Sequence, residues 1–195
     1  MKNAASAGIG IEADIIIDFR QAKDAYKFDV KSAGQGLKMV DFVVEMENAY
    51  LFIELKDPDN PASTPSNRRY YYEHNIKRNG LTNELVSKFK DSVIISWAQD
   101  KCMDKPIYYI VILEASFVGQ EKFLSIERGI AKRLPFKLNF RDYPFKRTVI
   151  EQFLLMDMAL WNKYFPEFPI YRKSKLRKEN RRDFLRDLEH QLKNI

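Results

Sequence analysis

Three charged residues interrupt two apolar runs in residues 38–57, and their types suit cation binding. Asp41 lies in the first run, and Glu54 and Lys56 lie in the second. Carboxylate oxygens are preferred ligands of hard divalent cations, and Mg²⁺ uses one or two of them while keeping several waters. An ammonium group beside such a site stabilises nearby negative charge. These residue types predict a site for Mg²⁺ or Mn²⁺, provided that the three side chains meet.

The spacing of the two runs predicts a β-hairpin that brings the charges together. The polar pair Glu47-Asn48 separates the runs, as a tight turn does. Antiparallel partners keep a constant sum of residue numbers, so a turn centred on this pair places Asp41 opposite Glu54. Side chains alternate between faces along a strand, and Lys56 therefore shares that face. The opposite face is expected to be apolar and to carry Val40, Phe42, Val44, Leu51, Ile53 and Leu55.

At these residues the chain resembles the PD-(D/E)xK superfamily of metal-dependent nucleases. Asp41 matches the first acid and Glu54-Leu55-Lys56 matches the ExK element, although Val40 stands in place of the leading proline. The resemblance implies that Asp41, Glu54 and the backbone carbonyl of Leu55 bind the cation, and that Lys56 assists the attacking water. It also implies phosphodiester hydrolysis, with DNA as the expected substrate and RNA as the alternative.

A further acid often comes from the first helix in this superfamily. Asp24 and Asp29 are the nearest candidates here, Glu12 is more remote, and no motif selects among them. Glu45 lies four residues after Asp41 and would share its face of the strand. It is therefore another candidate, although it lies closer to the turn. The sequence therefore leaves the additional acid open.

Basic residues suggest a nucleic-acid partner. The net charge of +6 and the pI near 9.2 favour a polyanion without requiring one. Residues 172–182 hold seven Lys or Arg in eleven positions, which fits either a phosphate-contacting arm or a solvated connector. Residues 68–80 interleave basic side chains with three consecutive tyrosines, which suits phosphate contact with base stacking or a partly packed aromatic segment. The candidate contacts are Lys88, Lys90, Arg68, Arg69, Arg172, Lys173, Lys175, Arg177 and Lys178.

Upstream of the hairpin, the local signals are short. The Asp18-to-Gln21 spacing matches a capping box and predicts a short helix over FRQAKDAYKF. The preceding Ile15-Ile16-Ile17 fits a strand or an earlier helical turn.

Downstream of the hairpin, periodicity predicts alternating helices and strands. Residues 57–67 contain three prolines and predict an exposed loop. An amphipathic helix over 81–100 is expected to bury Leu81, Leu85, Phe89, Val93 and Trp97. A strand over 106–114, a helix over 120–134 and a strand over 148–156 form a predicted βαβ crossover. A short helix capped by Asp157, an edge strand over 168–172 and a helix over 180–195 complete the chain.

This order predicts an α/β protein with a restriction-endonuclease-like mixed sheet flanked by helices and a C-terminal helix. Residues 1–195 suit one domain, with a core over about 14–172 and a basic helical extension over about 173–195. No apolar run approaches the roughly 20 residues that cross a bilayer, and the start, which has no continuous apolar segment, is not expected to be a secretory signal. The single Cys102 fits a reducing cytoplasm. We therefore expect a cytoplasmic protein without a membrane partner.

Two function classes remain after these arguments. The first is a nuclease that depends on Mg²⁺ or Mn²⁺ and acts in genome defence, mobile-element biology or repair. The second is a noncatalytic nucleic-acid-binding or assembly subunit of a larger complex. In either class, a homodimer or a partner subunit would supply targeting, because the sequence contains no separate specificity domain.

Overall fold

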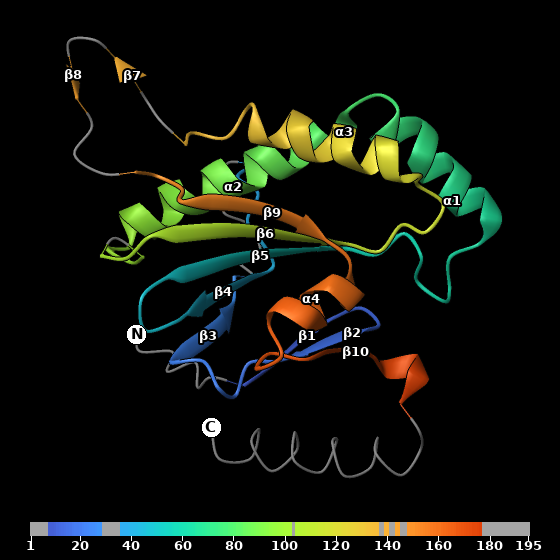
Figure 1. Ribbon diagram of the computed structural model, residues 1–195, viewed down its shortest axis with the longest axis horizontal. Helices are drawn as coiled ribbons and strands as arrows, with labels where there is room; N and C mark the ends of the chain where they lie inside the picture. The colour runs from blue at the N-terminus through green and yellow to red at the C-terminus, as the bar shows by residue number, and fades with distance from the viewer. Residues whose placement is uncertain are drawn as a thin grey trace.

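A five-stranded mixed sheet forms the middle layer of the protein. The structure is a computed structural model that describes residues 8–28, 36–102, 104–136, 139–140, 143–144 and 148–176. Within these residues the strand order is β3-β4-β5-β6-β9, with the first three strands antiparallel and the last three parallel (Figure 1). The strands are β3 Asp24–Lys27, β4 Phe42–Glu45, β5 Tyr50–Lys56, β6 Ile107–Leu113 and β9 Gln152–Met156.

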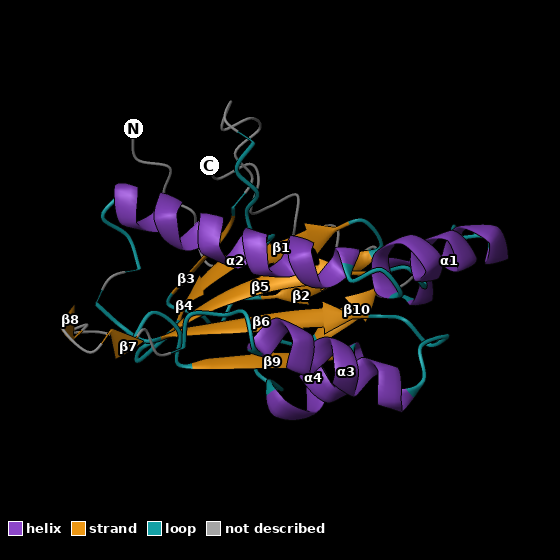
Figure 2. Ribbon diagram, turned by 90° about the horizontal axis from the view of Figure 1, so that it is seen from above, coloured by secondary structure: helices purple, strands orange, loops and turns teal. Residues whose placement is uncertain are grey.

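Helices cover one face of this sheet, and a smaller antiparallel sheet with one helix covers the other (Figure 1). Figure 2 shows α2 over the antiparallel side of the sheet and α3 over the β9 side. The helices are α1 Pro65–Tyr71, the π-helix η1 Tyr72–Ile76, α2 Gly80–Ala98, α3 Gln120–Ala131, α4 Met158–Tyr164 and the 3₁₀ turn η2 Lys173–Lys175. The smaller sheet has the order β1-β2-β10, with β1 Ile9–Glu12, β2 Ile15–Asp18 and β10 Ile170–Arg172. A separate pair consists of β7 Asn139–Phe140 and β8 Tyr143–Pro144.

The predicted hairpin is confirmed with its register. Phe42 lies opposite Ile53, and Glu45 lies opposite Tyr50, so the turn falls at Glu47-Asn48. A slip of one residue would exchange the two faces of both strands. Because each face contacts a different core, the hydrophobic pattern fixes this register.

The predicted βαβ crossover is also confirmed. β6 and β9 pair in parallel, with α3 between them along the chain. Parallel strands that are covered on both faces become near-continuous apolar runs, and β6 accordingly reads IYYIVIL. Among the described residues, no helix is both long and apolar enough to span a membrane.

Two apolar cores lie on opposite faces of the sheet. The helix-side core packs α2 and α3 on the sheet and includes Val43, Phe52, Leu85, Phe89 and Ile130. The other core packs the smaller sheet and α4 on the sheet and includes Phe42, Ile53, Ile112, Trp161 and Phe168. β5 contributes alternate residues to the two cores. A polar side chain on the same face of β5 as Phe52 is therefore covered by the helices and must be buried.

The short helix expected after Asp18 is absent, and a turn followed by β3 occupies that segment. The Asp18 carboxylate accepts hydrogen bonds from the backbone N–H and the guanidinium of Arg20. The chain then pairs with β4, which satisfies the backbone groups of β3 in the sheet. Tertiary pairing thus outweighs a local capping signal. Ile15–Ile17, which fitted either a strand or a helical turn, lies in β2.

Val40 lies on the helix side of the sheet and not on the face expected for it. The antiparallel ladder begins only at Phe42, so strand alternation does not extend to Val40. Its backbone N–H donates a hydrogen bond of 2.9 Å to Ser92 Oγ of α2. This bond joins α2 to the residue directly before Asp41.

The inward stripe of α2 changes character towards its C-terminus. Trp97 was expected in the core, but 63% of its surface is exposed. Ser92 and Ser96 are buried on this part of the helix instead. Trp161 does lie fully in the core, where its indole N–H donates to the carbonyl of Phe168.

A helix begins inside the segment that was expected to be a loop. Thr64 caps α1 by accepting a hydrogen bond from the N–H of Asn67, and Pro65 occupies the first helical turn. Elsewhere the predicted elements differ mainly in their ends, since α3 ends at Ala131 and α4 continues to Tyr164. The helix expected over 180–195 lies outside the described residues.

Candidate functional site

The start of β4 and the end of β5 bring the two predicted acids together. Since Phe42 pairs with Ile53, Asp41 lies just beyond the ladder beside Glu54. Asp41 Oδ2 accepts a hydrogen bond of 2.8 Å from the N–H of Leu55, which fixes this carboxylate across the strand pair. The N–H and C=O of a strand residue point to the same side, so the carbonyl of Leu55 also faces the Asp41 edge.

Glu54 is a fully buried carboxylate held under α2. Its Oε1 lies 2.6 Å from the Nζ of Lys88 and 3.0 Å from the Nζ of Lys56. Its Oε2 is buried and has no hydrogen-bond partner within the described part of the chain. A buried carboxylate oxygen without a partner costs free energy, so this geometry favours an additional cation or proton.

Helix α2 adds two charges to the cluster. Lys88, which was predicted to contact phosphate, also lies 3.5 Å from Asp41 Oδ1. Glu84, one helical turn earlier, accepts a hydrogen bond of 2.7 Å from Lys56 Nζ. The sequence analysis missed Glu84, although its spacing from Lys88 places both on one side of the helix.

Burial and like charge destabilise the ionised acids. Burial raises the pKa of Asp41, and the Lys88 ammonium offsets only part of that effect. Burial raises the pKa of Glu54 to about 7, with the Asp41 carboxylate adding to the rise. Burial lowers the pKa of Lys56, but Glu54 and Glu84 raise it by more, so the net pKa lies above the ordinary value. Lys56 is therefore an ammonium at neutral pH.

Tyr71 is a further buried polar group near the cluster that sequence reasoning did not identify. Burial raises the pKa of its phenol to about 12, and the charges of Lys56, Glu84 and Glu54 also act on it. Its hydroxyl is buried and has no hydrogen-bond partner among the described residues. The end of α1 thus places a neutral hydroxyl near Lys56.

A pocket of about 360 Å³ opens beside Asp41. Asp41 and Lys88 line it together with Glu12 of β1, Lys27 of β3 and Lys38. Glu12 is paired with Lys27 over 2.8 Å, and its charge contributes to raising the pKa of Asp41. Glu12 is remote in sequence but near in space, because β1 packs beside the start of β4.

The structure separates two other candidate acids from the site. Asp24 and Glu45 lie opposite each other at the far end of the β3–β4 ladder from Phe42. Glu45 pairs with Lys23 and Lys105, and Asp24 accepts from the N–H of the next residue. Neither carboxylate can join Asp41. Asp29 lies outside the described residues.

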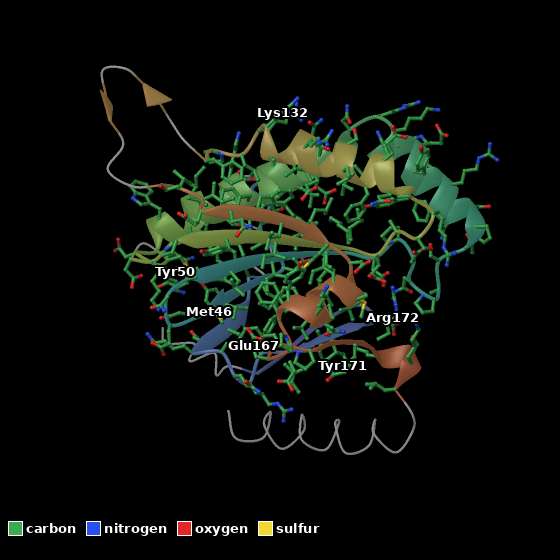
Figure 3. All side chains as sticks on the ribbon, viewed as in Figure 1. Met46, Tyr50, Lys132, Glu167, Tyr171 and Arg172 are labelled. Atoms are coloured by element: carbon green, nitrogen blue, oxygen red, sulfur yellow. The ribbon has the colours of Figure 1, made fainter. Side chains whose placement is uncertain are left out.

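The predicted basic contacts fall into different environments. Arg172, labelled in Figure 3, is buried. It forms a bidentate ion pair with Asp57 over 2.7 and 2.8 Å and also contacts Glu114. Since Arg172 is buried and both of its terminal nitrogens contact these carboxylates, we no longer expect it to contact nucleic acid. Arg69, Lys90 and Lys175 are exposed, Arg68 is half-buried near Asp59, and Lys173 donates to the carbonyl of Ala13. Arg177 and Lys178 lie outside the described residues.

The donor set suits a hard cation more than zinc. Asp41, Glu54 and the Leu55 carbonyl offer oxygen ligands, and Glu54 Oε2 lacks another partner in the described chain. No group of three or more His, Cys, Asp or Glu side chains in the described ranges is arranged to hold a metal ion. Two carboxylates with waters are sufficient for Mg²⁺ or Mn²⁺.

Comparisons with protein-family models, curated proteins and solved structures found no match.

Proposed function

We propose that this protein is a nuclease that depends on Mg²⁺ or Mn²⁺ and hydrolyses phosphodiester bonds, with DNA as the first substrate to test. The observation that carries the proposal is the convergence of Asp41 and Glu54 at one end of the hairpin, with Lys56 beside them. The order of hairpin, long helix, strand, helix and strand supports a restriction-endonuclease-like arrangement. The first helix of that arrangement has no counterpart in residues 8–28, where strands occur instead.

Asp41, Glu54 and the Leu55 carbonyl would hold the cation. When bound, the divalent ion would lower the pKa of an attacking water and stabilise charge on the phosphate oxygens. Asp41 stays oriented for this task because its second oxygen is fixed by the Leu55 N–H. Glu54 is withheld from bulk water, which strengthens its interaction with positive charge.

Lys56 would act as a hydrogen-bond donor and a fixed positive charge. Its raised pKa keeps the proton on Nζ, so it would orient the water and stabilise the phosphate instead of removing a proton. Glu84 holds the ammonium from the opposite side over 2.7 Å. The lysine is thus oriented before substrate binds.

The alternative is a noncatalytic nucleic-acid-binding subunit. Lys88 and Lys56 already neutralise much of the charge on Asp41 and Glu54, as they would in a purely structural ion-pair network. A cleavage assay separates the two functions. The wild type, Asp41→Asn and Lys56→Met would be incubated with supercoiled plasmid and single-stranded DNA in Mg²⁺, Mn²⁺ or EDTA. Lys132→Met at the exposed C-terminal end of α3 is the matched control.

The nuclease proposal expects cation-dependent cleavage by the wild type and by Lys132→Met. Both site variants should be slower by at least about 100-fold, as when a charge-stabilising group is removed. If DNA binds with normal salt dependence and is never cleaved, the noncatalytic function is correct.

A further inference from the structure

Lys88 occupies an unusual position between the two candidate cation ligands. Its Nζ lies 2.6 Å from Glu54 Oε1 and 3.5 Å from Asp41 Oδ1, and its side chain is 16% exposed. The backbone of this turn is anchored, because Ser92 Oγ donates to the Lys88 carbonyl and accepts from the Val40 N–H. The helical turn that carries Lys88 is thus joined to the residue directly before Asp41.

The Lys88 ammonium contacts Glu54 Oε1 and Asp41 Oδ1, so it repels a divalent cation that is held by the same two carboxylates. Mg²⁺ requires ligand oxygens at about 2.0–2.1 Å in near-octahedral geometry. The Lys88 ammonium carries no lone pair to contribute, and its charge would repel a cation held by the same carboxylates. A metal bound between these carboxylates therefore disfavours the position that Lys88 occupies.

We propose that Lys88 fills the cation position in the metal-free protein and that a divalent cation binds by displacing its ammonium from Glu54. This inference rests on the proposed function, since it concerns the same pair of carboxylates. It assigns Lys88 a second position, in which the displaced ammonium remains at the mouth of the site, where phosphate would enter.

The surroundings make Lys88 the lysine that moves. Lys56 Nζ lies between Glu54 and Glu84, at 3.0 and 2.7 Å. Lys56 therefore keeps Glu84 as a carboxylate partner when Glu54 binds a metal. Lys88 lines the pocket of about 360 Å³ that also contains Glu12. That pocket gives the flexible lysine stem room, although Glu12 there is already paired with Lys27 over 2.8 Å.

Mn²⁺ affinity tests the displacement directly. The full-length protein would be stripped with EDTA, and Mn²⁺ binding would be measured by titration calorimetry for the wild type, Lys88→Met and the control Lys132→Met. Removal of the competing ammonium should tighten Mn²⁺ binding by at least about tenfold, the scale expected for a hydrogen bond between charged groups. The control should bind as the wild type does.

Thermal unfolding provides a second readout, because Lys88→Met should lower the melting temperature in EDTA but increase the stabilisation by Mn²⁺. In EDTA, Lys88→Met should unfold at a lower temperature than the wild type, because two neighbouring carboxylates lose a counter-charge. Saturating Mn²⁺ should then raise its melting temperature by more than it raises that of the wild type. Lys88→Gln, which keeps a neutral donor towards Glu54, should show the same directions if the methionine variant does not fold.

Equal or weaker Mn²⁺ affinity in both Lys88 variants would overturn the displacement, whatever their activity. Mn²⁺ binding without cleavage of plasmid or single strand would overturn the proposed function and leave the displacement to be judged by affinity. Loss of Mn²⁺ binding in Asp41→Asn locates the measured site at the hairpin. Binding that persists in Asp41→Asn would place the metal elsewhere and overturn both inferences.

Discussion

Substitution of Glu54 by glutamine should remove the pH dependence that this buried acid imposes on stability. In the metal-free protein, the folded-state pKa of Glu54 is about 7, against an ordinary value of 4.5. The folded state therefore prefers the protonated acid. Its contribution to stability is fully present below about pH 4.5 and is lost as the pH rises through about 7. Glutamine has nearly the same shape and remains neutral throughout.

The size of the effect follows from the two pKa values. The full difference corresponds to about 3 kcal/mol, of which about 2 kcal/mol falls between roughly pH 5.5 and pH 8.5. Urea unfolding in EDTA at those two pH values would measure it. The free energy of unfolding of Glu54→Gln, relative to the wild type, should rise by about 2 kcal/mol over this interval. Glu151→Gln, at an exposed position before β9, is the matched substitution.

Comparing each variant with the wild type at the same pH removes the titration of acids that do not interact with Glu54 from the result. A relative stability of Glu54→Gln that stays constant or falls as the pH rises would refute the reasoning. Such a result would mean that Lys88 and Lys56 fully compensate the buried charge. Saturating Mg²⁺ should stabilise the wild type at high pH and leave Glu54→Gln nearly unchanged.

Three further substitutions test the surroundings of the site. Arg172→Met should lower the free energy of unfolding by about 3–5 kcal/mol in urea, because it leaves buried carboxylates without their partner; an unchanged midpoint with weaker DNA binding would contradict this. Tyr70→Ala should weaken single-stranded DNA binding by roughly 5- to 100-fold in fluorescence anisotropy. The Tyr70 ring is exposed and stacks on His74, and its removal would abolish any stacking of a DNA base on it. Tyr164→Ala, equally exposed on α4, should change it little, and equal losses would count against stacking at Tyr70. Gly10→Ala should destabilise by about 1–3 kcal/mol in urea, because its Cβ would lie 2.6 Å from an aromatic ring; wild-type stability would show that the ring moves aside.

Several contacts between residues far apart in the sequence could not be predicted from the sequence. Glu12 could not be associated with Asp41, because their proximity depends on packing of the smaller sheet against β4. In the sequence, Arg172 belongs to a basic run. In the structure, its position in β10 brings its guanidinium to Asp57, the residue after Lys56. Charge composition predicts a surface only when the fold leaves those charges in water.

Local order along the chain was more predictable. The hairpin register followed from two apolar runs around a short polar turn, because the position of the turn fixes which residues pair and a slip would exchange the two faces. The helix after Asp18 failed for the converse reason, since a short capping signal is weaker than the backbone hydrogen bonds that β4 supplies. Segments with one strong periodic pattern were predicted correctly, whereas short segments yielded to their neighbours.

The sequence by itself determined that Asp41, Glu54 and Lys56 lie together, because strand alternation and antiparallel pairing are local and periodic. Only the tertiary structure decided what surrounds them. Packing of α2 on the sheet buried Glu54 and brought Lys88 to its carboxylate, while Glu84 met Lys56. These contacts depend on the position and rotation of one layer over another, which no spacing within a single segment specifies.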